Sequence, residues 1–275
     1  MKAIPVFFLI AIFFSACSTN NVTVDDSLGR FFDSAGVKGC FALFDNGQGR
    51  FTVYNLPRYR DSAYPAGSTF DFVASLIAFQ SGVIKNDKAV MAVGSHDVAD
   101  SGHPGQRAPQ NTDIILGDAF KSNGFESIYR HVEDSIGIDS LRKWVDALHY
   151  GNRALDKDTN AVYDGNLKIS ADEQLGLIKK LYFNQLPFFR RSQEMVRDMM
   201  SKVENSNYKL VTKVANVSYQ GHTLGWVMGW VEENRHPYFF VLNLETADPH
   251  ANAALIGTQI VEHILPSMGF FEGKK

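Results

Sequence analysis

Strand-like segments lie at both ends of the chain and helix-like segments lie between them, which limits the folds open to it. After residue 36, two strand-like runs flank the turn sequence DNGQG, as in a β-hairpin. Residues 119–200 carry apolar residues at helical spacing. From residue 209, three strand-like runs precede a last helix, ANAALIGTQIVEHIL. Because strands from both ends can share one antiparallel sheet, we predict an α+β fold with terminal helices on the sheet and a helical insertion beside it.

The first 17 residues form an export signal by their composition. Lys2 precedes an apolar stretch from residue 3 to 14, which is too short for a confident membrane span. The sequence Phe14-Ser15-Ala16-Cys17 resembles a bacterial lipobox, in which the cysteine is lipidated. Ordinary cleavage near Ala16 and an uncleaved anchor are the alternatives. We expect a lipoprotein signal peptide over 1–16, a polar tether over 17–27 and a domain over 28–275.

Lipidation at Cys17 would hold the protein to a membrane, because each buried methylene contributes roughly 0.8 kcal/mol. We therefore expect an exported, membrane-anchored protein of the bacterial cell envelope, facing the periplasm or the cell surface. The chain has 275 residues, a net charge of −3 and no strongly basic stretch, so nucleic acid is not an expected partner. Only Cys40 remains in the mature body, in an apolar run that predicts a buried, inert thiol.

Neither a metal nor a cofactor is expected. Four residues of metal-ligating types occur close together in one loop, at positions 96, 97, 100 and 103 (His96, Asp97, Asp100 and His103). No helical or strand spacing aligns them, so a polar surface loop is the favoured interpretation. Trp226 and Trp230 are interpreted as packing residues of a strand.

The stretch YPAGSTFDF, residues 64–72, allows two interpretations of Ser68. A helix is predicted from Phe70 to Phe79, with Gly82 as its stop. A serine followed three residues later by Asp71, just before an apolar run, is typical of a capping box. Alternatively, Ser68 is a nucleophile and Asp71 lies one helical turn away from it.

The local pattern by itself favours the cap, and the order and spacing of several short segments keep the second interpretation open. They are VKGCFALFDN, TVYN, YPAGSTF, SLIAFQSG, HYGN, GNLKIS, LPF, GWVMGWV and LNLE. Together they resemble the class D (oxacillinase-type) serine β-lactamases of the penicillin-recognising acyl-enzyme superfamily, over roughly residues 28–270. The resemblance implies their α+β fold, a β-lactam or peptidoglycan-derived ligand, and acylation of a serine at the position of Ser68.

The resemblance also implies a base that this chain lacks. In the family a Ser-x-x-Lys motif opens the central helix, and its carboxylated lysine activates the serine and then the deacylating water. Ser68-Thr69-Phe70-Asp71 keeps the serine but has an acid in place of the lysine. Asp71 is also a carboxylate, but its side chain is several bonds shorter than a lysine carbamate.

Two further family motifs differ in how well they are kept. The serine of the family's Ser-x-Val motif falls on Asn123 or Gly124, according to the alignment, and neither has a hydroxyl; Ser122 fits only with a further shift. The Tyr-Gly-Asn motif is intact, which implies substrate-binding positions for Tyr150 and Asn152. Its alternative interpretation is a helix stop, with Gly151 in the left-handed conformation.

The family's Lys-Thr/Ser-Gly motif is changed to Lys213-Val214-Ala215. Lys213 keeps the positive charge and is a candidate proton acceptor for the serine, or else a surface residue. At the substrate-binding positions, Val214 cannot donate a hydrogen bond to a substrate carboxylate, and Ala215 adds a methyl group where substrate lies close to the strand.

Two supporting family residues are also missing. Val162 stands where the family has the tryptophan that binds the carboxylated lysine. No arginine occurs over residues 249–254, where the family has one that binds the substrate carboxylate; His250 is nearby.

These observations favour a lipid-anchored class D-like protein that recognises β-lactams or peptidoglycan peptides with little or no hydrolysis. One alternative is an active β-lactamase with Asp71 as its base. The other is a non-catalytic partner-binding module in which Ser68 is only a cap. The oligomeric state does not follow from the sequence.

Overall fold

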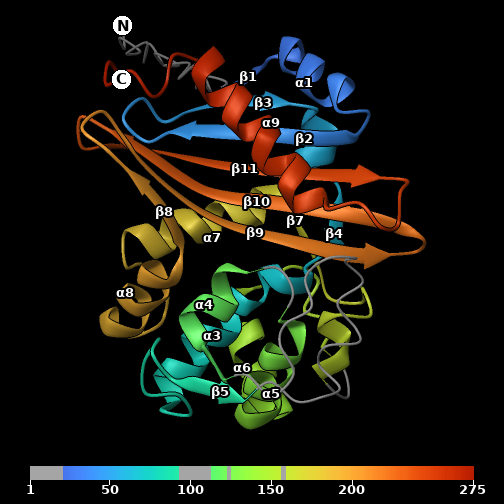
Figure 1. Ribbon diagram of the computed structural model, residues 1–275, viewed down its shortest axis with the longest axis vertical. Helices are drawn as coiled ribbons and strands as arrows, with labels where there is room; N and C mark the ends of the chain where they lie inside the picture. The colour runs from blue at the N-terminus through green and yellow to red at the C-terminus, as the bar shows by residue number, and fades with distance from the viewer. Residues whose placement is uncertain (1–20, 93–112, 123–124, 156–158) are drawn as a thin grey trace, which may run out of the picture.

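A seven-stranded sheet dominates the computed structural model, which describes residues 21–92, 113–122, 125–155 and 159–275 (Figure 1). The strand order is β1-β3-β2-β11-β10-β9-β8. The strands are β1 (Val22–Val24), β2 (Lys38–Asp45), β3 (Arg50–Tyr54), β8 (Ser201–Glu204), β9 (Lys209–Tyr219), β10 (His222–Glu233) and β11 (His236–Thr246). Strand β2 pairs antiparallel with β11, with Phe41 opposite Leu242, so the two ends of the chain share one sheet as predicted.

Helices cover both faces of this sheet. The helices α1 (Gly29–Ser34) and α9 (Ala253–Ser267) pack on one face over a separate apolar cluster (Figure 1). The other face carries α2 (Leu56–Arg60) and α7 (Ala171–Tyr182), and beyond them lies a helical part made of α3 (Asp71–Ser81), α4 (Leu116–Lys121), α5 (Glu126–Ile136), α6 (Ile138–Leu148) and α8 (Arg190–Met199). The predicted α+β class is confirmed.

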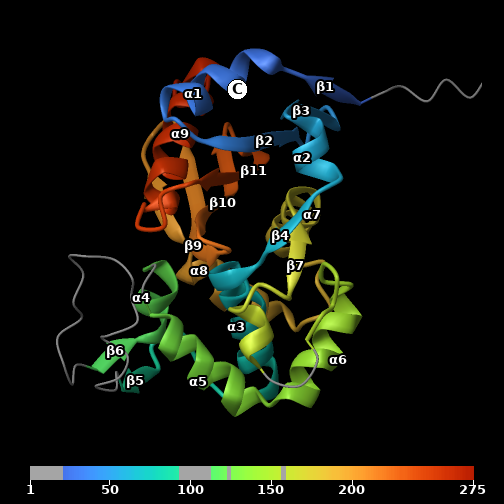
Figure 2. The ribbon, with the colours of Figure 1, turned by 90° about the vertical axis from the view of Figure 1, so that its right-hand side faces the viewer.

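Two short strands connect the sheet to the helical part. Strand β4 (Ala63–Pro65) pairs antiparallel with β7 (Lys168–Ser170), and Figure 2 shows them side by side between the sheet and helix α3. A second two-stranded sheet joins β5 (Val90–Ala92) to β6 (Asp113–Ile115). The four metal-ligating residue types between positions 96 and 103 lie outside the described residues.

Local sequence signals explain the ends of several elements. The DNGQG hairpin joins β2 to β3 as predicted. Helix α3 stops at Gly82, whose φ of 75° is left-handed, as predicted. Cys40 is fully buried, and this burial raises the pKa of its thiol to about 12, which makes it inert.

The N-terminal tether was predicted over residues 17–27, and this prediction is wrong for the part that the structure describes. Residues Val22–Val24 form β1, which pairs parallel with β3, and the 3₁₀ turn η1 (Asp26–Leu28) follows. The signal peptide and Cys17 lie outside the described residues. Across the described ranges, no helix has both the length and the apolar character needed to cross a bilayer.

Candidate active site

Ser68 lies in a 3₁₀ turn, η2 (Gly67–Thr69), immediately before helix α3. Helix α3 begins at Asp71, its N-cap is Phe70, and no side chain caps it. The prediction that Ser68 caps this helix is therefore wrong, because the 3₁₀ turn runs into the helix without a break. Ser68 is half-buried, and in the described part of the chain its hydroxyl makes no hydrogen bond.

Three contacts fix the turn that carries Ser68. Gly67 has a φ of 48°, and a Cβ atom there would lie 2.4 Å from Cγ2 of Val217 on β9, so only glycine allows this approach. The indole Nε1 of Trp226 on β10 donates to the Pro65 carbonyl at 3.0 Å. The Thr69 hydroxyl donates to the Ala66 carbonyl at 2.7 Å. Contacts from β9 and β10 therefore fix the position of the turn that carries Ser68. Trp226 is buried and is a packing residue, as predicted.

Asp71, which stands at the lysine position of the Ser-x-x-Lys motif, binds Lys213 of the altered Lys-Thr/Ser-Gly segment. Lys213 Nζ lies 3.1 Å from Asp71 Oδ2 and donates at 2.7 Å to the Phe120 carbonyl. The Lys213 ammonium also lies 4.2 Å from the centre of the Phe120 ring. Both charged side chains are almost fully buried, at 2% and 4% exposure. The alternative that Lys213 is a surface residue is therefore wrong.

Burial controls the charge of this pair. It raises the pKa of Asp71 to about 6, and the opposing attraction of Lys213 does not cancel the effect. Burial also lowers the pKa of Lys213, against the attraction of Asp71. Above pH 6 the pair is an ion pair with its hydrogen bonds in place. An ammonium has no lone pair, so Lys213 cannot accept the proton of Ser68 while the pair is charged.

The residues of the intact Tyr-Gly-Asn motif make packing and backbone contacts close to Ser68. Tyr150 is buried, and its ring packs edge-on against Phe70, with centroids 5.4 Å apart. Asn152 accepts from the Lys168 backbone N–H at 3.0 Å and donates to the Asn166 carbonyl at 2.8 Å. Because Lys168 belongs to β7, which pairs with β4 just before Ser68, Asn152 positions the strand that leads to Ser68 indirectly.

The helix stop in this motif differs from the prediction. Helix α6 ends at Leu148, and His149 is the left-handed residue after it, with a φ of 52°. Gly151 also has a positive φ, of 49°, but its role is a close approach: a Cβ atom there would lie 1.9 Å from the Lys168 carbonyl oxygen. The glycine therefore allows the loop to touch β7.

The altered Lys-Thr/Ser-Gly segment divides between the two faces of β9. Ala215 is buried in the core on the side of α3, as is the Lys213 side chain, whereas Val214 packs in the cluster under α9. Val214 thus does not share a face with Ala215. Ser122 is exposed at the end of α4, and residues 123–124 lie outside the described residues.

The two supporting positions also have clear locations. Val162 is fully buried in the core, and His250 is exposed in the loop before α9. His250 contacts Asp248 only through its backbone N–H. Neither residue supplies the polar contact that the family residue at its position would supply.

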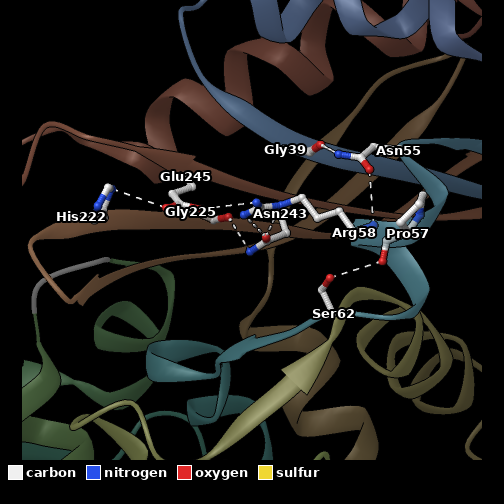
Figure 3. Close-up of polar contacts among 9 residues, drawn as sticks. All are labelled: Gly39, Asn55, Pro57, Arg58, Ser62, His222, Gly225, Asn243 and Glu245. Carbon is white, nitrogen blue, oxygen red and sulfur yellow. Dashed lines mark hydrogen bonds and ion pairs between the residues drawn. The ribbon is translucent and has the colours of Figure 1, made fainter.

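A second polar cluster, which sequence analysis missed, anchors helix α2 to the sheet (Figure 3). Arg58 donates to Asn243 Oδ1 at 2.8 and 3.1 Å and pairs with Glu245 at 3.3 Å. His222 lies 3.4 Å from the same carboxylate. Arg58 lies on α2 and already binds Asn243 and Glu245, so it does not replace the family arginine that is missing from residues 249–254. Its contacts instead hold the segment that leads into β4 and Ser68.

Comparison with known proteins gives consistent results. Residues 39–265 match the family described as penicillin binding protein transpeptidase domain. The chain is 32% identical to β-lactamase OXA-20 of Pseudomonas aeruginosa, over 79% of this chain and 78% of that protein. It is 28% identical to regulatory protein BlaR1 of Bacillus licheniformis, over 91% of this chain but only 40% of BlaR1.

A solved structure also resembles this chain. The C-terminal domain of the Bacillus licheniformis BlaR penicillin receptor superposes with a TM-score of 0.78 and 28% identity, covering 92% of this chain and 98% of that domain. The match therefore falls within one domain of the longer regulatory protein.

Proposed function

Because the chain belongs to the penicillin-binding protein transpeptidase family, and within it to the class D β-lactamase-like proteins, we propose that it is a β-lactam receptor. Its ligand class is a β-lactam or a peptidoglycan-derived peptide, and its reaction is acylation of Ser68 with little or no hydrolysis. The observation that carries the proposal is the buried Asp71–Lys213 pair, which stands where the family has a free base.

The proposed reaction stops at the acyl-enzyme, so it needs no residue that activates water for hydrolysis. The Ser68 oxygen bonds to the lactam carbonyl carbon, the lactam C–N bond breaks, and the serine proton ends on the lactam nitrogen. Hydrolysis would then need a base to activate water. Asp71 Oδ2 is held by Lys213, and losing such a base costs roughly 10⁴-fold or more in rate. The family base also activates the serine, so acylation of Ser68 is expected to be slow, and the acyl-enzyme, once formed, is expected to persist.

The relatives support a receptor as well as an enzyme. One similar structure is described as a penicillin receptor, and one similar protein as a β-lactamase. The second candidate function, hydrolysis with Asp71 as base, is favoured only by the raised pKa of Asp71, which burial brings to about 6. It requires Asp71 to leave Lys213 during each turnover.

Labelled penicillin tests the proposal by intact-mass measurement. The wild-type protein is expected to gain one penicillin mass that persists for hours, and Ser68→Ala is expected to gain none. Ser218→Ala, which removes an exposed serine of β9, is the matched control and should label like the wild type. No adduct on the wild type would support a non-catalytic binding module instead.

The same samples separate the enzyme from the receptor. Nitrocefin turnover at tens per second, abolished by Asp71→Asn, would contradict the proposal and support Asp71 as the base. The receptor predicts turnover too slow to clear the adduct, with little further change in Asp71→Asn beyond its effect on stability.

We also propose that lipidation at Cys17 places this domain in the bacterial cell envelope. The lipobox-like sequence Phe14-Ser15-Ala16-Cys17 supports this placement. In cells, Cys17→Ser is expected to move the protein from the membrane fraction to the soluble fraction, because it removes the acyl chains. An unchanged membrane fraction would point to an uncleaved anchor.

A further inference from the structure

A buried carboxyl group behind the candidate site has no role in the proposed reaction. Glu133 lies on α5, is fully buried, and faces α3. Its Oε1 accepts a hydrogen bond from the Tyr163 hydroxyl at 3.1 Å. Its Oε2 is buried and has no hydrogen-bond partner in the described ranges, and the same is true of Asp71 Oδ1.

The contact between α3 and α5 brings these groups into one cluster. Ser75 on α3 and Tyr129 on α5 share a hydrogen bond of 3.0 Å in the helix interface. Asp71 lies one helical turn from Ser75, and Glu133 lies one turn from Tyr129, so all four side chains occupy the facing sides of the two helices. The interface therefore holds two buried carboxyl groups, and Lys213 reaches only one of them.

The charges in this cluster do not balance if both carboxyl groups ionise. Two carboxylates and one ammonium would leave one buried negative charge without a counter-ion, and such a charge neutralises by taking up a proton. Asp71 has Lys213 at 3.1 Å, whereas the described partner of Glu133 is a neutral hydroxyl. The proton therefore belongs on Glu133.

The other charged groups around Glu133 act more weakly than burial and the charge of Asp71: Arg130 lowers the pKa of Glu133 and Asp134 raises it. On α5, Arg130 pairs with Glu126 at 2.5 Å, and its guanidinium lies over the Tyr163 ring. Asp134 adds negative charge and is exposed. On α6, which packs against α5, Arg142 pairs with Asp139.

We infer that Glu133 stays protonated in the native protein, so that the helix interface beside the Asp71–Lys213 pair holds no second buried negative charge. The proposed function does not contain this inference, since it concerns a proton in the helix interface and not the acylation of Ser68. In agreement, burial and then the charge of Asp71 raise the pKa of Glu133 well above its ordinary value.

The pH dependence of unfolding tests the inference. A raised native pKa stabilises the fold at low pH, and this stability is lost as pH rises from the unfolded value toward the native one. Asp71 contributes in the same sense, but only up to about pH 6. Between pH 6 and pH 8, the unfolding constant of the wild type is therefore expected to rise with pH relative to that of Glu133→Gln, by up to about tenfold per pH unit.

Two controls make the test specific. Asp146→Asn makes the same carboxyl-to-amide substitution at an exposed position on α6, and its profile should run parallel to the wild type. Glutamine resembles the protonated carboxyl group, so Glu133→Gln should match the wild type near pH 5. Parallel profiles of Glu133→Gln and wild type between pH 6 and pH 8 would overturn the inference.

A second measurement covers the case in which Glu133→Gln does not fold. Infrared spectra of the folded wild type at pH 7 are expected to contain the C=O band of a buried protonated carboxyl group. Asp71 is mostly ionised at that pH, so the band would come from Glu133. Absence of the band would overturn the inference without any variant.

Discussion

Lys213→Met is expected to lower the free energy of unfolding by about 3–5 kcal/mol at pH 8, because it leaves Asp71 buried and charged without its partner. Urea unfolding measures this loss. At pH 5 the loss should be smaller, because burial already raises the pKa of Asp71 to about 6 in the wild type, and without the opposing attraction of Lys213 the carboxyl group takes up a proton more readily still.

A double variant and a surface control define the origin of this effect. Asp71→Leu combined with Lys213→Met replaces both charges by apolar groups and should regain most of the lost stability. Lys202→Met removes an ion pair of similar length, 2.9 Å to Asp198, but this pair lies at the surface. It should cost less than about 1 kcal/mol. Equal losses in Lys213→Met and Lys202→Met would contradict the importance of burial.

Gly151→Ala is expected to destabilise the protein by roughly 2–5 kcal/mol, because the new methyl group meets the Lys168 carbonyl and the positive φ disfavours alanine. The loss should appear as a fall of roughly 10 °C in the thermal midpoint. Moving β7 also breaks the Asn152 contacts that position β4, so penicillin labelling of Ser68 should slow as well.

Gly176→Ala is the matched control for this substitution. Gly176 lies inside helix α7, and a Cβ atom there would meet nothing within 4 Å. Alanine should therefore stabilise the helix by up to about 1 kcal/mol. If both glycine variants gain stability, the close contact at Gly151 is not a constraint on the fold.

Sequence periodicity was sufficient to predict the α+β class, because strands and helices impose different spacings on the same apolar residues. Local patterns were less reliable at the site. The Ser-x-x-acid pattern at Ser68 and Asp71 is not a capping box, whereas Ser170 and Glu173 form one at the start of α7. The backbone distinguishes the two: Ser170 is extended at the N-cap of α7, whereas Ser68 lies in the 3₁₀ turn that runs into α3. Asp71 binds Lys213 instead, 142 positions away along the chain, and this contact leaves no local trace in the sequence.

Glu133 did leave a signal in the sequence. It follows Tyr129 by four residues and precedes Ile136 by three, so it lies on the apolar side of helix α5. An acid on that side is expected to be buried and to have an unusual charge state. Its partner Tyr163 could not be predicted, because that contact depends on how the loop after η3 (Thr159–Val162) packs against α5.

The pairing of β2 with β11 sets the order in which the chain can fold. Residues 41 and 242 are neighbours in the middle of the sheet, so the central strands cannot assemble until nearly the whole chain is available. Contacts this distant in sequence slow folding, because a long loop must close first. An unfinished chain would thus lack the centre of its sheet, a partly unfolded state in which a polypeptide can still pass through a narrow channel before it folds.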